Sequence, residues 1–203
     1  MGKIKVSVII PVYNQEKLVI KCLESIPKRE DVEIIVVNDG STDKTLGFLK
    51  NFQKFGNKDL KIITYEKNKG VSYARNSGID ISEGEYIVMI DSDDYIYGDI
   101  FNKIVDNYLN GEDLVFYDME NNGKVRFSAT QNNYKSKYGM FKFIKKEFLG
   151  DMRFQLGMQY AEDKDLHLRM MDKYPRCYFT NMIMYHYNYP RKGSLSSVGE
   201  NRG

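Results

Sequence analysis

The feature that most constrains the fold is a repeated alternation of apolar runs with helix-spaced segments in the first half of the chain. The runs are residues 5–11, 33–38, 60–65 and 86–90, and helical patterns follow them near 18–26, 43–55, 71–81 and 100–108. A strand, a helix and a second strand in succession form a right-handed crossover between parallel strands. The alternation therefore predicts an α/β fold with a mostly parallel, Rossmann-like sheet that is flanked by helices on both faces.

The alternation weakens after residue 113. The runs 113–119 and 124–128 predict strands, the segments 136–149 and 162–171 predict helices, and the tail from Tyr178 has a strand-like, aromatic pattern. A chain of 203 residues with 42% hydrophobic content is long enough for one sizeable core. We therefore expect residues 1–203 to form one domain, with a first half (1–112) and a second half (113–203).

Composition excludes several classes of protein. The 30 basic and 28 acidic residues nearly balance, so no nucleic-acid partner is expected. Cys22 and Cys177 stand far apart, which argues against a disulfide framework or a zinc site and favours a reducing compartment. No apolar run has the length of a membrane-spanning helix, and Pro11 interrupts the first one. We expect a cytoplasmic protein, with attachment to the inner membrane face left open.

Two basic features have an ordinary interpretation. Lys142, Lys145 and Lys146 alternate with apolar residues, as on the solvent-facing side of an amphipathic helix. His167 likewise has the setting of a helix-surface residue. Neither feature is expected to belong to a site.

Acidic residues gather where predicted strands end. Asp91, Asp93 and Asp94 follow the fourth apolar run, and Asp39 follows the second. Pro11 and Tyr13 stand at the end of the first. Ligands bind open parallel sheets outside the carboxyl ends of the strands, so we expect these segments to face one crevice.

The acidic cluster has two interpretations. Aspartates after strands commonly cap helices and form turns, and this applies to Asp39 as well as to residues 91–94. Alternatively, clustered carboxylates share a hard cation such as Mg²⁺ or Mn²⁺. An EF-hand is excluded because Ile96 stands where that loop requires glycine, and neither a P-loop nor a GxGxxG motif is present.

A cation at this edge of the sheet would suit a phosphorylated ligand. Tyr13 could stack on a base, and carboxylates could accept hydrogen bonds from base or ribose. Arg75 could add a bidentate contact to a carboxylate or phosphate, or it could be a solvated helix residue. These residue types together describe a nucleotide site in which a metal replaces the glycine-rich phosphate loop.

Six motifs in order resemble family 2 glycosyltransferases of the GT-A fold. They are PVYN (11–14), VVNDGSTD (36–43), NKGVSYARNSG (68–78), IDSDD (90–94), AED (161–163) and YHYNYPRKGSLS (185–196). The resemblance covers essentially the whole chain. It implies a nucleotide-diphosphate sugar donor, a divalent cation (Mn²⁺ or Mg²⁺) and an inverting reaction on a saccharide or glycoconjugate acceptor.

The resemblance also implies roles for individual residues. The nucleotide-sugar group comprises Pro11, Tyr13, Asp39, Arg75, Asp91, Ser92, Arg191 and Ser194. The metal group comprises Asp93, with Asp91, Asp94 and His186 as further ligands. Residues 1–112 would bind the donor, and residues 113–203 would form the acceptor side and a C-terminal lid that includes Arg191 and Ser194. His186 has a second interpretation, as a packing residue of an aromatic-rich strand.

Asp163 is the implied catalytic base, with Glu162 orienting acceptor or donor. Inversion needs a base opposite the leaving group to take the proton of the acceptor hydroxyl, and a carboxylate at a helix start is stabilised as the anion. Both residues could instead be simple helix caps.

The sequence therefore predicts an inverting, metal-dependent glycosyltransferase that uses a UDP-sugar to extend a polysaccharide or glycoconjugate. Two alternatives stay open. A nucleotidyltransferase on a similar sheet would need a glycine-rich basic loop after the first strand, and residues 11–17 contain no glycine. The other alternative is a catalytically silent binding module for sugar nucleotides or glycans. The acceptor, the sugar and the oligomeric state are not encoded in any pattern that we can interpret.

Overall fold

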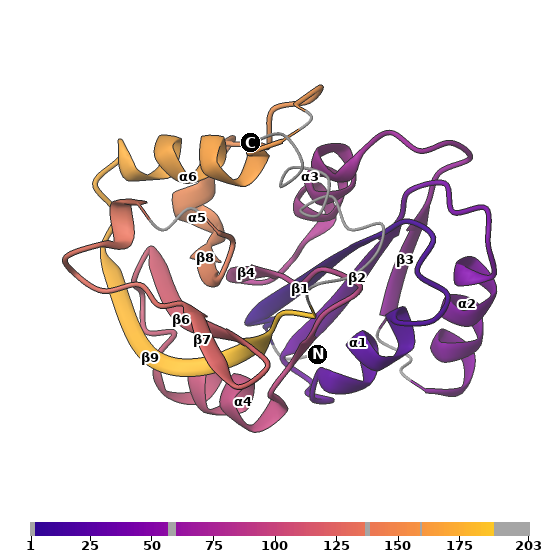
Figure 1. Ribbon diagram of the computed structural model, residues 1–203, viewed down its shortest axis with the longest axis horizontal. Coiled ribbons are helices and arrows are strands. Elements are labelled where there is room, and N and C mark those ends of the chain that lie inside the picture. The colour runs from indigo at the N-terminus through magenta and orange to yellow at the C-terminus, as the bar shows by residue number, and fades with distance from the viewer. Residues whose placement is uncertain (1–2, 57–59, 137–138, 159, 189–203) are drawn as a thin grey trace.

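The computed structural model describes residues 3–56, 60–136, 139–158 and 160–188. Within these residues the strands form one nine-stranded sheet in the order β3-β2-β1-β4-β8-β6-β9-β5, with β7 paired to β6 (Figure 1). The strands are β1 (Val6–Val12), β2 (Val32–Asn38), β3 (Leu60–Thr64), β4 (Tyr86–Met89), β5 (Tyr95–Ile96), β6 (Leu114–Asn121), β7 (Lys124–Phe127), β8 (Lys142–Lys145) and β9 (Cys177–His186). The helices are α1 (Val19–Ser25), α2 (Thr45–Phe55), α3 (Val71–Ile81), α4 (Gly98–Asn107), α5 (Lys146–Leu149) and α6 (Glu162–Met171).

The strands β3, β2, β1 and β4 are all parallel, as the alternation predicted. Successive residues of β2 serve the two faces of the sheet. Ile34 and Val36 join the large core that includes Leu49 of α2, whereas Ile35 and Val37 pack with Ala74 of α3. Figure 1 shows α3 on one side of these strands and α1 and α2 on the other. Burial on both faces explains the continuous apolar runs, and the predicted fold class is confirmed.

The second half of the sheet is mixed. β8 pairs antiparallel with β4 and with β6, and β6 pairs parallel with β9. The helix predicted over 136–149 is wrong, because the structure has a 3₁₀ turn at Tyr134–Ser136, then β8, then the short α5. A strand that lies between two others makes backbone hydrogen bonds on both edges, and this tertiary pairing overrides a local helical pattern.

Two basic residues that were expected at the surface are buried. Lys142 and His167 have exposed fractions of 0%. Lys146 also lies against the protein, where its Nζ donates to the Ser82 carbonyl. The amphipathic-helix interpretation of the lysine cluster is therefore wrong, and so is the surface interpretation of His167.

The loops that follow β1 and β2 are joined to each other. The Asp39 N–H donates to the Val12 carbonyl at 2.9 Å, and the Thr42 N–H donates to Asn14 Oδ1 at 2.8 Å. At the end of β4, the Ile90 N–H donates to the Ile9 carbonyl at 3.0 Å. The three strand ends therefore open at one edge of the sheet, where the crevice was expected.

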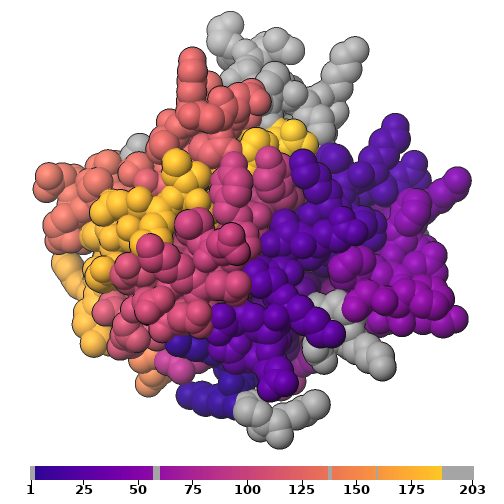
Figure 2. Space-filling model, turned by 90° about the horizontal axis from the view of Figure 1, so that it is seen from below, coloured from indigo at the N-terminus to yellow at the C-terminus, as the bar shows by residue number. Residues whose placement is uncertain are grey.

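A surface contact joins the end of α1 to α4. Figure 2 shows the segments of α1 (indigo) and α4 (pink) side by side on the face seen from below. Arg29, which follows α1, bonds to Asp106 of α4 at 2.8 Å and to Asn102 at 3.3 Å. Among the helices of the described residues, none has both the length and the apolar character to cross a membrane.

Candidate active site at the carboxyl ends of the strands

Arg75 connects the acidic turn after β4 to the start of α6. It projects from α3 and is buried, with 7% of its surface exposed. Its Nη2 donates to Asp91 Oδ1 at 3.0 Å, and its Nη1 donates to Glu162 Oε1 at 2.7 Å. Burial alone would lower the pKa of the guanidinium, but the charges of Asp91 and Glu162 outweigh it and raise that pKa. Arg75 therefore stays charged between the end of β4 and the start of α6.

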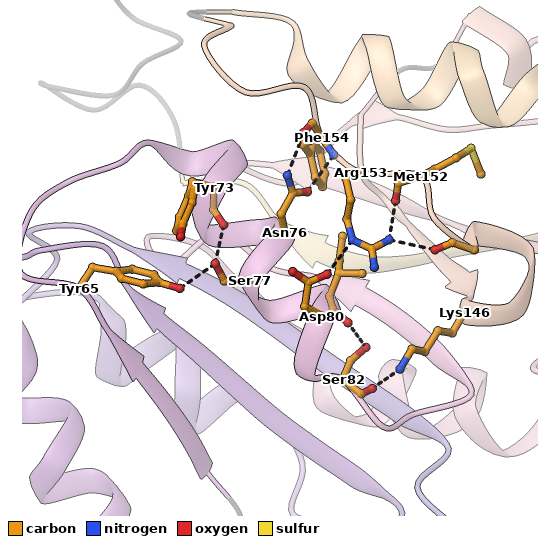
Figure 3. Close-up of polar contacts among 12 residues, drawn as sticks. Tyr65, Tyr73, Asn76, Ser77, Asp80, Ser82, Lys146, Met152, Arg153 and Phe154 are labelled. Atoms are coloured by element: carbon orange, nitrogen blue, oxygen red, sulfur yellow. Dashed lines mark hydrogen bonds and ion pairs between the residues drawn. The ribbon is translucent and has the colours of Figure 1, made fainter.

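The segment before α6 is tied to α3 by side chains that Figure 3 draws. Asn76 donates to the Phe154 carbonyl and accepts from the Phe154 N–H, both at 2.8 Å. Arg153 bonds to Asp80 at 2.8 Å. These contacts place the Phe154 ring 5.3 Å from the Arg75 guanidinium. The helix α3 thus holds both the arginine and the aromatic ring beside it.

A cavity of about 310 Å³ is lined both by Asp91, a residue predicted to contact the donor, and by Asp163, the predicted base. Asp91 lines it from β4, Asp163 lines it from α6, and Arg75 lies between them. The remaining lining residues are Met89, Met119, Gly139, Met140, Phe141, Tyr185 and Tyr187. The wall is therefore largely apolar, with carboxylates and one arginine at defined places, as in small-molecule sites.

Asp163 stands in the first turn of α6, after Ala161 in the left-handed conformation (φ 61°). Burial, followed by the charge of Glu162, raises its pKa above the ordinary value. The Lys164 N–H, Arg75 and Lys142 act in the opposite direction. A carboxylate with a raised pKa is a stronger base, which is the property that a general base requires.

Asp94 is held inside the protein. It is 2% exposed, its Oδ2 accepts from the Tyr185 hydroxyl at 2.6 Å, and its Oδ1 accepts from the Asn188 N–H at 2.8 Å. Burial, with a further contribution from Asp91, raises the pKa of Asp94 to about 7. The same Tyr185 hydroxyl accepts from the Asp91 N–H at 3.1 Å. Asp94 thus anchors the end of β9 to the acidic turn, and both of its oxygens are engaged.

Asp91 and Asp93 remain as the carboxylates for a cation. The Asp91 side chain is 45% exposed, and its Oδ1 also accepts from Arg75. Among the described residues, no three histidine, cysteine or acidic side chains gather as a metal site. A hard cation that keeps several waters and bridges one or two carboxylates to a diphosphate needs no such cage. The residues present therefore fit a cation that arrives with the donor, and they do not form a site complete by itself.

His186 is fixed by neighbours on the adjoining strands. Its Nδ1 bonds to Glu120, and its ring stacks on Tyr95 with centroids 4.2 Å apart. Glu120 is 4% exposed and also accepts from the Tyr97 hydroxyl at 2.8 Å. The structure thus gives His186 the packing role that the sequence left open. A carboxylate on one ring nitrogen also orients the other nitrogen, as at metal-ligating histidines.

The residues predicted for the nucleotide lie at the ends of β1 and β2. Tyr13 is 45% exposed, which leaves its ring accessible for stacking. Pro11 and Ser92 are buried. Asp39 is also buried, and its two oxygens accept from the N–H groups of Lys69 (2.9 Å) and Gly70 (2.8 Å) at the start of α3. Asp39 therefore fixes the loop that precedes α3 and does not cap the helix that follows it in the sequence. A carboxylate has lone pairs for a further partner.

Two predicted residues, Arg191 and Ser194, lie outside the described residues. Conversely, four residues that hold the site residues in place had no role predicted from the sequence: Tyr185 and Asn188, which lie in the motif at 185–196, and Glu120 and Phe154. Their contacts join segments that are 66 to 94 positions apart in most cases, so no local pattern could reveal them.

Comparison with known proteins identifies the class. The profile of "Glycosyl transferase family 2" matches residues 7–165, so the chain belongs to this family. The predicted family and GT-A fold are confirmed, the fold also by similarity to the crystal structure of S. aureus TarS 1-349 in complex with UDP-GlcNAc. That match has a TM-score of 0.80 and 25% identity, and it covers 95% of this chain and 61% of the TarS chain.

Curated relatives come from Streptococcus pneumoniae serotype 4. The chain is 31% identical to "Glycosyltransferase GlyA" over 96% of its own length and 32% of GlyA. It is 29% identical to "Glycosyltransferase GlyG" over 94% of its length and 72% of GlyG. The chain thus spans about a third of the length of GlyA.

Proposed function

We propose that this chain transfers a sugar from a nucleotide-diphosphate donor, a UDP-sugar, to a hydroxyl group of a saccharide or glycoconjugate, with inversion at the anomeric carbon. The observation that carries the proposal is the shared cavity, in which Asp91 and Asp163 are joined through Arg75 and Glu162. A simple capping role for Glu162 would not place its carboxylate on a buried arginine of another helix.

In the proposed reaction, Asp163 accepts the proton of the acceptor hydroxyl. The acceptor oxygen forms a bond to the anomeric carbon, and the bond from that carbon to the diphosphate oxygen breaks, with its electron pair leaving on the diphosphate. The raised pKa of Asp163 favours receipt of the proton. The apolar cavity wall of Met89, Met119, Met140 and Phe141 limits water around the reacting groups.

Glu162 and Arg75 act as positioning residues in this proposal. Because Arg75 has one hydrogen bond to each side of the cavity, it fixes the distance between the end of β4 and the start of α6. The carboxylate of Glu162 also forms an ion pair with the Arg75 guanidinium. Acceptor and donor would then meet in a geometry that is set before either binds.

Asp93 and Asp91 would hold a divalent cation, Mn²⁺ or Mg²⁺, with His186 as a further ligand whose ring Glu120 orients. When bound, the cation supplies positive charge that stabilises the departing diphosphate. We assign Asp94 to anchoring the acidic turn, because its oxygens accept from Tyr185 and Asn188. Tyr13 would stack on the base, and Asp39 would combine its backbone contacts with one to a base edge. UDP is proposed on the resemblance and on the similarity to TarS 1-349, whose crystal structure contains UDP-GlcNAc.

The test is a panel of nucleotide sugars with Mn²⁺ or Mg²⁺, scored by transfer to saccharide acceptors and by release of nucleoside diphosphate. Parent, Asp163→Asn and Asp165→Asn are compared. Asparagine caps a helix about as well as aspartate, but it cannot take the proton. We expect Asp163→Asn to bind UDP and the cation as the parent does, and to lose on the order of 10² to 10⁴ in transfer rate.

Asp165→Asn is the matched control, since Asp165 lies in the same helical turn but pairs with Arg169 at 2.6 Å. It should retain most of the parent rate. Transfer by Asp163→Asn at close to the parent rate would remove Asp163 as the base and make Glu162 the next residue to test. Full activity in excess EDTA would contradict the proposed requirement for a divalent cation. Absence of transfer with every donor would contradict the proposed function.

A further inference from the structure

A fully buried lysine lies next to the cavity and has no part in the reaction described above. Lys142 stands at the start of β8 and is 0% exposed. Its Nζ donates to the Gly139 carbonyl at 2.6 Å and lies 5.3 Å from the centre of the Phe116 ring. A buried ammonium group costs substantial free energy unless other charges compensate it, so its presence requires an explanation.

The topology places the Lys142 side chain on the face of the sheet opposite α4. Lys142 pairs with Phe116 of β6, while the adjacent Phe143 packs against Phe101 of α4 on the other face of the sheet. Alternate residues of a strand point to opposite faces, so the Lys142 side chain points away from α4. Asp163 and His167 are four positions apart on α6 and therefore share one face of that helix. Both lie within electrostatic reach of Lys142.

Lys142 is also attached to the cavity wall. Gly139, which accepts its hydrogen bond, lines the cavity together with Met140 and Phe141. Asp163 lines the same cavity from the other side. Lys142 thus bonds to the cavity wall of residues 139–141 and is within electrostatic reach of the proposed base, Asp163.

We propose that Lys142 is a positioning residue of the active site: its buried ammonium group stabilises the anion of Asp163 from beneath and holds the wall of residues 139–141 through Gly139. This inference rests on the proposed role of Asp163 as the base. It adds a residue that no motif contains, and it explains why a charge is retained inside an otherwise apolar layer.

The charged groups around this pair come from four elements. Asp163 faces Glu162 on its own helix, Arg75 from α3 and Lys142 from β8. Lys142 is influenced by Asp163 on α6 and by Cys177 of β9. Burial raises the pKa of the Cys177 thiol to about 12, so it is neutral near pH 7. Burial lowers the pKa of His167 to about 4, so His167 is neutral near pH 7 and adds no charge there. Burial lowers the pKa of Lys142 to about 7, and Asp163 opposes that change.

The decisive experiment measures the two groups directly and needs no substrate. The ¹³Cγ signal of Asp163, assigned by its absence in Asp163→Asn, is titrated by NMR in the parent and in Lys142→Met. Removing the ammonium group should raise the pKa of Asp163 by about one unit. Lys145→Met is the control on the same strand, because Lys145 pairs with Glu147 instead, and it should leave the titration unchanged.

The reciprocal measurement uses a variant that keeps the lysine. In Asp163→Asn the pKa of Lys142, followed by its ¹³Cε signal, should fall by a similar amount, since coupling between two sites is mutual. The Lys142 titration in Asp163→Asn tests the coupling between the two groups even if Lys142→Met does not fold. An unchanged Lys142 titration in Asp163→Asn, or an Asp163 pKa that stays constant in Lys142→Met, would overturn the proposal.

Kinetics then separates this inference from the proposed function. With an active donor, Lys142→Met should move the acid limb of the kcat/KM profile to higher pH by the same shift that NMR reports, with an unchanged KM for the donor. A uniform loss of rate at all pH values, without a shift, would show a role in packing alone and would overturn the inference. If no donor is transferred by the parent, the proposed function fails while the NMR result still stands.

Discussion

At the scale of single residues, Gly40 shows how tightly the loop after β2 is packed. Its φ is +71°, in the left-handed region, and a Cβ built on it would lie 2.4 Å from the Lys67 carbonyl carbon. The neighbouring Asp39 accepts hydrogen bonds from the Lys69 and Gly70 N–H groups, just before α3, with its two oxygens. Backbone approaches backbone here, so no side chain can yield. The NDG sequence is therefore required by the loop geometry, whatever Asp39 contributes to nucleotide binding.

We predict that Gly40→Ala lowers the free energy of unfolding by at least about 2 kcal/mol, through left-handed strain and the contact with Lys67. Gly47→Ala is the matched control. Gly47 lies in α2, and nothing lies within 4 Å of its added Cβ, so alanine should stabilise the protein by roughly 0.5–1 kcal/mol. Urea denaturation of both variants measures the difference. Equal stability of Gly40→Ala and the parent would contradict the described loop.

Individual residues also show where prediction from sequence ends. The sequence motifs contain Asp91, Arg75 and Asp163, which the structure brings to one cavity. They also contain Glu162, which bonds to Arg75. Lys142 was assigned to the surface, because a lysine is almost never fully buried unless it is paired. Its buried ammonium group bonds to the Gly139 carbonyl and is influenced by the charge of Asp163 on α6, and only the tertiary structure brings these groups together.

At the scale of elements, α3 organises the site from two sides. It packs on β1 and β2, carries Arg75, and receives Asp39 at its start. Its last turns are joined to residues 153 and 154 by Asn76 and Asp80 (Figure 3). The segment before α6 thus depends on α3 for its position. The proposed base at the start of α6 depends on it as well.

We predict that Asn76→Ala costs about 1–3 kcal/mol of unfolding free energy, since it leaves the N–H and C=O of Phe154 without their side-chain partner. Asp80→Ala, one turn further along α3, removes only an exposed ion pair with Arg153 and should cost at most about 1 kcal/mol. Thermal and urea unfolding of the two variants provide the comparison. A larger loss in Asp80→Ala would mean that the ion pair, not Asn76, holds the segment.

The elements divide into those that local pattern could predict and those that it could not. The four βα units were predicted because β1, β2 and β4 are buried on both faces and the helices on one, which leaves a clear periodicity. The strand β8 was missed: it has four residues, two of them lysines, and its backbone partners are in β4 and β6. The two-residue β5 exists through its pairing with β9. Such strands are defined by their neighbours.

At the scale of the whole molecule, the two halves of the chain share one sheet through the pairing of β4 with β8. Around that junction lie several titratable groups: buried Arg75 bonds to Asp91 and Glu162, and fully buried Lys142 is within electrostatic reach of Asp163 and His167. Enclosed charge makes the stability of the entire fold depend on pH, because each buried group binds protons differently in the folded and unfolded states.

The contribution of Lys142 has a sign that can be worked out. Its pKa is about 7 in the folded protein and 10.5 in the unfolded chain. Below about pH 7 the lysine is charged in both states, and folding bears the whole cost of burying that charge. Between about pH 7 and pH 10.5 the unfolded chain binds more protons than the folded protein does. The contribution of Lys142 to the free energy of unfolding therefore rises with pH. Above 10.5 the lysine is neutral in both states, and the cost disappears.

We therefore predict that Lys142→Met is more stable than the parent near pH 7, and that its advantage shrinks as the pH rises toward 10. The slope of the difference should approach about 1.4 kcal/mol per pH unit inside that window. Taking the difference removes the contributions of tyrosines and cysteines that titrate in both proteins. Urea denaturation at several pH values measures it, with Lys145→Met as the control that should give a flat difference. A Lys142→Met advantage that is independent of pH would show that Lys142 binds its proton equally in the folded and unfolded states, and would contradict the lowered pKa of the buried lysine.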